Sequence, residues 1–180
     1  MDVSLPYTLP YYDNIETIYV IDTCGLIKLE STFPPNNSTF HAVWQEIDIL
    51  ISQHCFRTID FVEQEINEYV GEKDFLKKWV AKRKKELVFE TTQQCYEKAI
   101  PIINSEFNTG FFDAKKQAEG KEEADVYLIA YSIVNNCTLI TNESKTKPNK
   151  IPAVSRKNGI KCIDIYDFIQ ERGLIMIRTK

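Results

Sequence analysis

Hydrophobic positions along the chain recur with two different spacings, and these predict alternating strands and helices. Short runs of β-branched and aromatic residues between polar segments indicate buried strands. The clearest is IYVID at 18–22, which is followed by a helix or turn over 23–29. The predicted strands are 18–22, 56–59, 138–141, 161–163 and 174–177. Apolar residues spaced three and four apart predict helices at 40–52, 61–70, 74–88, 91–107, 121–135 and 166–172, with a further short helix between 142 and 160.

The order of these elements predicts the fold class. Strands that alternate with helices are typical of parallel sheets whose right-handed crossovers cover both faces. We therefore expect a three-layer α/β/α sandwich around a central, mostly parallel sheet of four or five strands. No repeat or linker divides the chain, so residues 17–180 are predicted to form one domain. An N-terminal arm at 1–16, which contains prolines and tyrosines, precedes it.

Composition narrows the possible function classes. The chain has 180 residues, of which 43% are hydrophobic and 27% charged, as in an ordinary soluble domain. Its 22 basic and 26 acidic residues give a net charge of −4, so binding of nucleic acid would have to come from a local site. Five widely spaced cysteines without a CxxC pair fit neither a disulfide framework nor a zinc ribbon. No secretion signal or membrane span is recognisable, and we expect a cytoplasmic protein with reduced thiols.

Two acidic residues follow predicted strands directly. Asp22 ends the first strand, and Glu143 comes two residues after the LIT run at 139–141. Because the carboxyl ends of parallel strands meet at one edge of the sheet, we expect these carboxylates to lie close together. The alternative for Asp22 is an ordinary cap at the start of the next helix.

Two further acids are predicted to face the same edge from helices. Asp125 lies three and four residues before Leu128 and Ile129, on the apolar side of its helix. Glu65 lies on one flank of the apolar stripe of the helix after Asp60. Glu63 is the competing acid at the other flank, where it would form a capping box with Asp60.

Four acids at one edge would repel one another unless their pKa values rose or a divalent cation bound. Carboxylate oxygens are the ligands that Mg²⁺ and Mn²⁺ prefer, and neither histidine has metal-pair spacing with another ligand. Hard cations held in this way typically bind phosphates and activate water. The sequence therefore predicts a Mg²⁺ or Mn²⁺ site.

The chain resembles the PIN-domain ribonucleases, and more closely the subgroup described as a domain of unknown function, DUF4411. The resemblance runs from about residue 18 to residue 174. The matching segments are YVIDTCGLI at 19–27, Trp44 with its helix, VEQEI at 62–66, EEADVYLIAYS at 122–132, LITNES at 139–144 and IPAVSRKNGIKCIDIYDFI at 151–169.

The resemblance implies a metal-dependent endoribonuclease that hydrolyses phosphodiester bonds of single-stranded RNA. Asp22 and Asp125 would be direct metal ligands, and Glu65 and Glu143 would complete the metal shell or orient water. Thr23 would be a helper hydroxyl. Glu143 stands where many PIN domains have Asp, which places its carboxylate one methylene further from the backbone. Small PIN nucleases are often toxins held by an antitoxin and often form homodimers, so an antitoxin and a second copy are the implied partners.

A path for RNA needs positive charge, and two stretches offer it. Lys145, Lys147 and Lys150 follow Glu143 directly and are the predicted RNA-binding residues. The helix at 75–87 is also rich in lysine and arginine, but its apolar residues at helical spacing favour a solvated face over an RNA site.

Two other interpretations stay open at this stage. The fold could be a catalytically inactive PIN-like interaction module whose acids only cap helices. An aspartyl-nucleophile phosphatase is disfavoured because such enzymes usually place a second Asp two residues after the first, where this chain has Cys24.

Overall fold

The structure is a computed structural model that describes residues 16–68, 74–112 and 123–174. The predicted arm at 1–16 lies outside these residues except for Glu16. Within the described part, one sheet carries helices on both faces.

Five parallel strands form the sheet, in the order β3-β2-β1-β4-β5. They are β1 (Tyr19–Ile21), β2 (Phe56–Ile59), β3 (Val88–Phe89), β4 (Thr138–Ile140) and β5 (Cys162–Ile163). The predicted α/β class and parallel sheet are confirmed. Strand β3 was not predicted, because two half-buried residues leave no periodic signal. Leu174 lies outside any strand, and the rest of the predicted strand at 174–177 falls outside the described residues.

The helices lie close to their predicted positions. They are α1 (Thr23–Thr32), the short η1 (Ser38–Phe40), α2 (His41–Ser52), α3 (Asp60–Glu68), α4 (Asp74–Leu87), α5 (Gln93–Glu106), α7 (Ala124–Asn135), α8 (Ile151–Lys157) and α9 (Ile165–Glu171). Helix α5 runs through Pro101 without an interruption. In the described part of the chain, no helix is long and apolar enough to cross a membrane.

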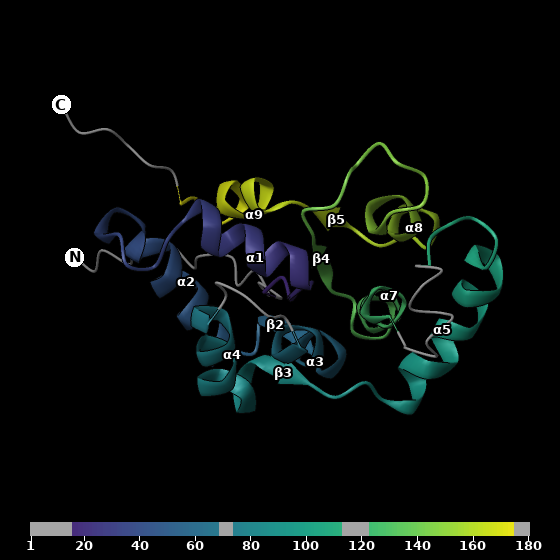
Figure 1. Cartoon of the computed structure of the whole chain (residues 1–180), viewed down its shortest axis with the longest axis horizontal. Coiled ribbons are helices and arrows are strands. Elements are labelled where there is room, and N and C mark those ends of the chain that lie inside the picture. Colours follow the sequence, from purple (N-terminus) through teal and green to yellow (C-terminus); the bar gives the residue numbers. More distant parts are fainter. Residues whose placement is uncertain (1–15, 69–73, 113–122, 175–180) are drawn as a thin grey trace, which may run out of the picture.

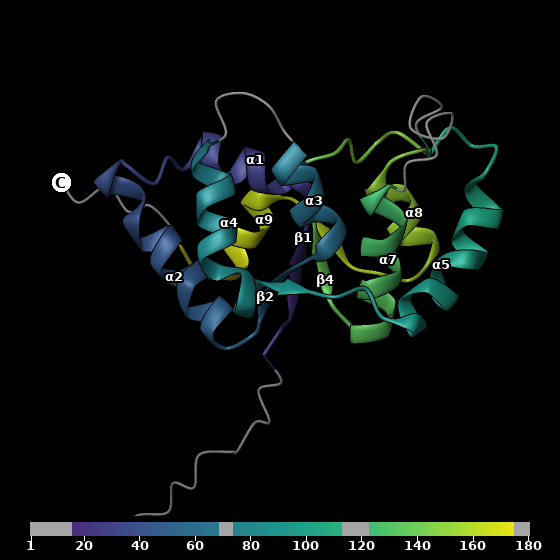
Figure 2. The same cartoon turned by 60° about the horizontal axis from the view of Figure 1, so that its bottom comes forward.

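Helices cover both faces of the sheet (Figure 2). α1, α2, α4 and α9 lie on one face, and α5, α7 and α8 lie on the other. This follows from the strand order, since right-handed crossovers that run in opposite directions along a sheet place their helices on opposite faces. The strands are buried between the two layers, with Val20, Phe56 and Leu139 fully inaccessible.

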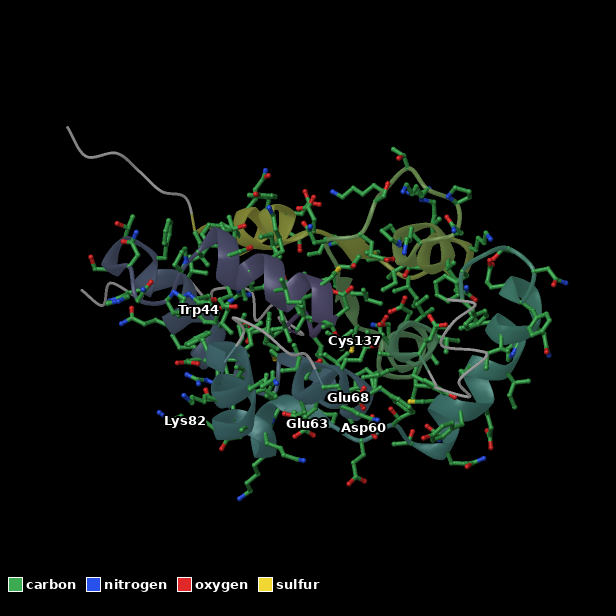
Figure 3. The ribbon with its side chains drawn as sticks, in the orientation of Figure 1. Trp44, Asp60, Glu63, Glu68, Lys82 and Cys137 are labelled. Atoms are coloured by element: carbon green, nitrogen blue, oxygen red, sulfur yellow. The ribbon has the colours of Figure 1, made fainter. Side chains whose placement is uncertain are left out.

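The basic helix α4 packs through its apolar side. Leu76, Trp79, Val80 and Leu87 are buried, which confirms the predicted solvated arrangement of its charges. Trp79 meets Trp44 of α2 edge to face at 5.5 Å between ring centroids. Lys82 points outward from this layer (Figure 3).

The strand order creates a crevice beside β1. From β1 the chain first adds β2 and β3 on one side, and later adds β4 and β5 on the other. In parallel α/β sheets, ligands bind outside the carboxyl ends of the strands at such a switch point. Here the switch point lies between the ends of β1 and β4, which are the strands that precede Asp22 and Glu143.

Candidate active site

Asp22 follows β1 and is the N-cap of α1. Its Oδ1 accepts a hydrogen bond from the backbone N–H of Gly25 at 2.5 Å, so the predicted capping contact is present. Its Oδ2 accepts hydrogen bonds from Thr141 Oγ1 at 2.6 Å and from Cys24 Sγ at 3.0 Å. Only 4% of Asp22 is exposed. The carboxylate therefore ties the end of β1 to the residue after β4, which is more than a cap requires.

Gly25 makes room for this carboxylate. A Cβ at this position would lie 2.7 Å from Asp22 Oδ1, 2.9 Å from Ile21 Cγ1 and 3.2 Å from the carbonyl oxygen of Ile140. None of these atoms belongs to a flexible chain end, since Asp22 and Ile21 are buried. The glycine in the DTCG segment is therefore required by close packing against the acid.

We expect Gly25→Ala to lower the free energy of unfolding by about 1–3 kcal/mol, the usual cost of overpacking. At an unconstrained helix position the same change stabilises a protein by about 0.5–1 kcal/mol, so the sign itself is informative. Urea denaturation would measure it, with Ser31→Ala on the exposed side of α1 as the control. A stabilised Gly25→Ala variant would contradict the packing seen here.

Asp125 lies in the first turn of α7. Burial first, and then the charges of Asp22, Glu143, Glu65 and Glu123 in that order of size, together raise its pKa to about 8. Burial also raises the pKa of Asp22 to about 6, against the lowering effect of its hydrogen bonds. The structure thus brings the four predicted acids into electrostatic contact around Asp125.

Glu65 and Thr23 meet across two helices. Thr23 Oγ1 donates a hydrogen bond to Glu65 Oε2 at 2.5 Å, so the predicted helper hydroxyl orients one of the predicted acids. Glu65 extends from α3 and is half-buried.

The two acids that compete with Glu65 lie elsewhere. Glu63 forms an ion pair with Lys84 at 2.8 Å. Asp60 accepts hydrogen bonds from the hydroxyl and the backbone N–H of Thr91 at 2.6 and 3.2 Å. Asp60 thus joins α3 to the segment after β3 in place of the predicted capping box with Glu63; Figure 3 shows both acids on the outer side of α3.

Glu143 is anchored at three points. Its backbone N–H donates to Thr141 Oγ1 at 3.1 Å. Its Oε1 accepts from Lys150 Nζ at 2.6 Å, and its Oε2 accepts from the backbone N–H of Ile151 at 2.8 Å. Glu143 therefore lies at the predicted edge, but its carboxylate also binds a cation of the chain itself.

The three predicted RNA-binding lysines have different surroundings. Lys150 is bound to Glu143 as described. The ammonium of Lys145 lies 2.7 Å from Asp164 Oδ2 and 2.7 Å from Asp167 Oδ2, at the start of α9. Lys147 is exposed on the connecting loop. Lys145 also lines a hollow of about 450 Å³ together with Arg156 and Lys157 of α8, two basic residues that the sequence did not single out.

The donor set suits a hard divalent cation. All four predicted acids supply oxygen, and the pKa values of Asp22 and Asp125 are raised because burial and mutual charge disfavour their ionised forms. A bound cation would reverse both effects. Within the three described ranges, no group of three or more His, Cys, Asp or Glu side chains is arranged so that it could hold a metal ion. Asp22 and Asp125 offer two carboxylates, which matches Mg²⁺, since it keeps several waters and takes one or two carboxylates from protein.

Three residues of the site escaped the sequence analysis. Thr141 bridges Asp22 and Glu143, Cys24 Sγ donates to Asp22 and accepts from the N–H of Asn142 at 3.3 Å, and Glu123 adds its charge next to Asp125. The hydroxyl of Thr141 directly after a strand was the available signal.

Burial raises the pKa of the Cys24 thiol, which keeps it a neutral donor. All five cysteines are free thiols, as predicted.

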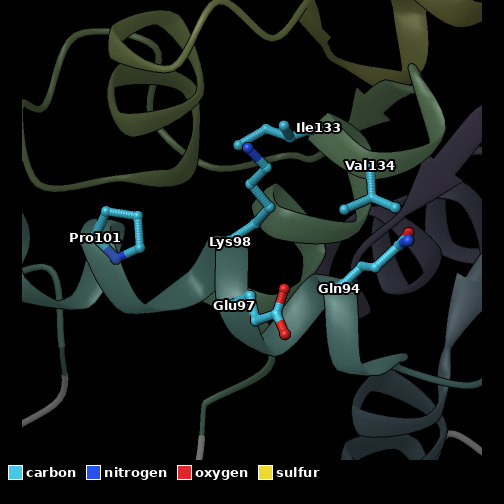
Figure 4. Close-up of a pocket in the computed structure, with 6 residues that line it drawn as sticks. All are labelled: Gln94, Glu97, Lys98, Pro101, Ile133 and Val134. Carbon is cyan, nitrogen blue, oxygen red and sulfur yellow. The ribbon is translucent and has the colours of Figure 1, made fainter.

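A larger hollow lies away from these acids. It measures about 630 Å³ and is lined by residues of α5 and of the end of α7 (Figure 4). Ile133 and Val134 line it, whereas Asp125 lies at the other end of the same helix, about 12 Å away at 1.5 Å per residue. This hollow does not belong to the acidic site.

A search of the curated proteins finds no match to this chain. Among solved structures, PAE2754 from Pyrobaculum aerophilum is similar over 88% of this chain and 91% of its own, with 9% identity and a TM-score of 0.47. The crystal structure of VapBC2 from Rickettsia felis bound to a DNA fragment from its promoter is similar over 82% of this chain and 98% of that chain, with 12% identity and a TM-score of 0.47. The family described as domain of unknown function DUF4411 matches residues 19–176, and the chain belongs to this family.

Proposed function

We propose that this protein is a PIN-type, metal-dependent endoribonuclease that hydrolyses phosphodiester bonds of single-stranded RNA. The observation that carries the proposal is the pair of carboxylates at the switch point of a parallel sheet, the buried Asp22 and the half-buried Asp125, with Glu65 and Glu143 beside them. Buried acids with raised pKa values in such a crevice are typical of functional sites and costly as purely structural features.

Each residue of the site has a part in this function. Asp22 and Asp125 would hold Mg²⁺ or Mn²⁺, which when bound supplies Lewis-acid activation of water and of the phosphate. Thr23 fixes the rotamer of Glu65 through its hydrogen bond, so that the Glu65 carboxylate is oriented before substrate arrives. Thr141 and Gly25 hold both oxygens of Asp22 in place.

The partners follow from the sequence resemblance. The substrate is RNA, bound through Lys150 and the basic residues along the loop and α8. The resemblance to toxin-type PIN proteins further suggests a toxin restrained by an antitoxin, and a homodimer as its assembly. A gene for a small protein beside the gene for this chain would support the antitoxin.

Cleavage of a 5′-labelled single-stranded RNA tests the proposal. We expect cleavage with Mn²⁺ or Mg²⁺, none with EDTA, and little on a duplex of the same sequence, because the resemblance implies a nuclease of single-stranded RNA. Calorimetry with Mn²⁺ provides the second measurement. A protein that binds no Mn²⁺ and leaves RNA intact would instead be the interaction module with a PIN-like fold.

A further inference from the structure

The predicted acid Glu143 and the predicted RNA-binding residue Lys150 form one unit. The ammonium of Lys150 lies 2.6 Å from Glu143 Oε1. Glu143 is itself fixed by the N–H of Ile151 on its other oxygen and by Thr141 on its backbone. A lysine normally has about 2 kcal/mol of rotamer entropy to lose on being positioned. Because Glu143 is fixed by Ile151 and Thr141, its bond to Lys150 restricts the rotamers of the lysine before a ligand binds.

This unit is connected to Asp22 and Asp125. Thr141 Oγ1 donates to Asp22 Oδ2 and accepts from the N–H of Glu143. The hydrogen bond with Glu143 raises the pKa of Lys150, and the charges of Glu143 and Asp125 raise it as well. Lys150 is therefore cationic at any working pH and lies within the field of Asp125.

The side chains of Glu143 and Lys150 differ in solvent exposure, which suits them to different roles. The side chain of Glu143 is 16% exposed, whereas that of Lys150 is 38% exposed. The acid lies deeper, and the ammonium lies at the rim, where a ligand in the crevice can reach it. Glu143 has its two oxygens engaged with the ammonium and with the start of α8.

The charge balance of the site explains why a cation such as Lys150 is needed beside the acids. A phosphodiester is an anion, and one divalent cation offsets only half of the charge of four ionised carboxylates. Without a further cation the crevice would repel its own substrate. Lys150 forms an ion pair with one of the four acids, whereas Lys145 is turned to Asp164 and Asp167.

We propose that Lys150 contacts a non-bridging phosphate oxygen of the RNA strand in the crevice, and that Glu143 is the residue that positions Lys150 and not a direct metal ligand. This inference rests on the proposed function and refines it. It divides the four acids into the two that would hold the metal, Asp22 and Asp125, the acid oriented by Thr23, which is Glu65, and a lysine-positioning residue, Glu143.

Metal binding without RNA separates the two roles of Glu143. Lys150→Met removes a cation next to the acids, so we expect Mn²⁺ affinity measured by calorimetry to rise about three- to tenfold. The double variant Glu143→Gln/Lys150→Met removes the ion pair at constant net charge while Gln still accepts from Ile151. We expect its Mn²⁺ affinity to stay within about threefold of wild type. A loss of more than about tenfold in the double variant would show that Glu143 is a metal ligand and would overturn its assignment.

RNA binding in EDTA tests Lys150 without any cleavage. In fluorescence anisotropy with a single-stranded oligonucleotide, Lys150→Met should bind several-fold more weakly and lower the salt slope by about 0.7, the value of one phosphate contact on a single strand. Lys150→Arg should restore both. Lys82→Met, an exposed lysine of α4, is the matched control and should leave the slope unchanged. A wild-type slope in Lys150→Met, or no RNA binding by the wild type, would overturn the phosphate contact.

Cleavage provides a third measurement. We expect kcat of Lys150→Met to fall about 10²-fold, and the double variant to be no slower than Lys150→Met alone, because Glu143 acts through the lysine. Additive losses would overturn the positioning role. A wild type that binds Mn²⁺ and RNA but cuts nothing would contradict the proposed function and leave the binding results for Lys150 standing.

Discussion

Asp125→Asn should abolish the metal-dependent cleavage of RNA, with a fall in kcat/KM of about 10³-fold, or about 4 kcal/mol of transition-state stabilisation. Asp125 is the acid on which the others converge, since the charges of Asp22, Glu143 and Glu65 all act on it. Asparagine has almost the same shape but lacks the charge that a divalent cation needs. The heat of Mn²⁺ binding in calorimetry should disappear together with the activity.

The control for this variant is Asp48→Asn. Asp48 lies on α2, where its carboxylate accepts two hydrogen bonds from Arg83 at 2.7 and 2.8 Å, so the same chemical change is made outside the crevice. We expect wild-type cleavage and wild-type Mn²⁺ affinity from it. If Asp125→Asn retained either the cleavage or the binding heat, the acids of the crevice would not be the metal site.

The fold was predictable because apolar residues at regular spacing mark most of its strands and helices. The strand at 18–22 and the helices that follow it were predicted from residues that are buried for packing reasons alone. Strand β3 was not predictable, because Val88 and Phe89 form a strand only through pairing with Thr58 and Ile59. These partners lie 30 residues earlier in the chain. The helix containing Glu65 lies at its predicted position, with Glu65 bonded to Thr23 and Glu63 paired with Lys84.

The candidate site was predictable as a set of acids and not as a set of contacts. Asp22 and Glu143 were identified from their position after strands, which a parallel sheet brings together whatever the loops do. The bond between Glu143 and Lys150 depends on the path of the six residues that connect them, and no period or propensity encodes that path. Asp60 and Glu63 show the same limit, because their partners Thr91 and Lys84 come from other elements.

The cost of holding the crevice acids together should be visible in the unfolding of the metal-free protein. The folded-state pKa values of Asp125 and Asp22 are raised to about 8 and about 6, whereas an unfolded chain would lose these protons near pH 4. Between these limits the folded state binds more protons than the unfolded state. The stability from these groups is therefore complete below about pH 4 and is lost as pH rises through 6 and then 8.

We accordingly expect the free energy of unfolding to fall by about 4–6 kcal/mol between pH 5 and pH 8.5, because about three pKa units of Asp125 and one of Asp22 lie in this range and each corresponds to 1.36 kcal/mol. Urea denaturation in EDTA at several pH values would measure it. Asp125→Asn should flatten most of this slope and be more stable than wild type at pH 8.5. A slope that is equally steep in Asp125→Asn would assign the pH dependence to other groups.

Mn²⁺ should reverse this trend in the wild type. A cation that binds only the folded protein stabilises it by about 2.7 kcal/mol at a hundredfold excess over its dissociation constant. Because it binds ionised carboxylates, the gain should be largest at pH 8.5 and vanish toward pH 5, and it should be absent in Asp125→Asn at every pH. An interaction module whose acids only cap helices has no reason to regain with Mn²⁺ the stability that it loses with rising pH. The joint dependence of unfolding on pH and on the metal therefore separates a metal-binding site from a purely structural one, even before an RNA substrate is known.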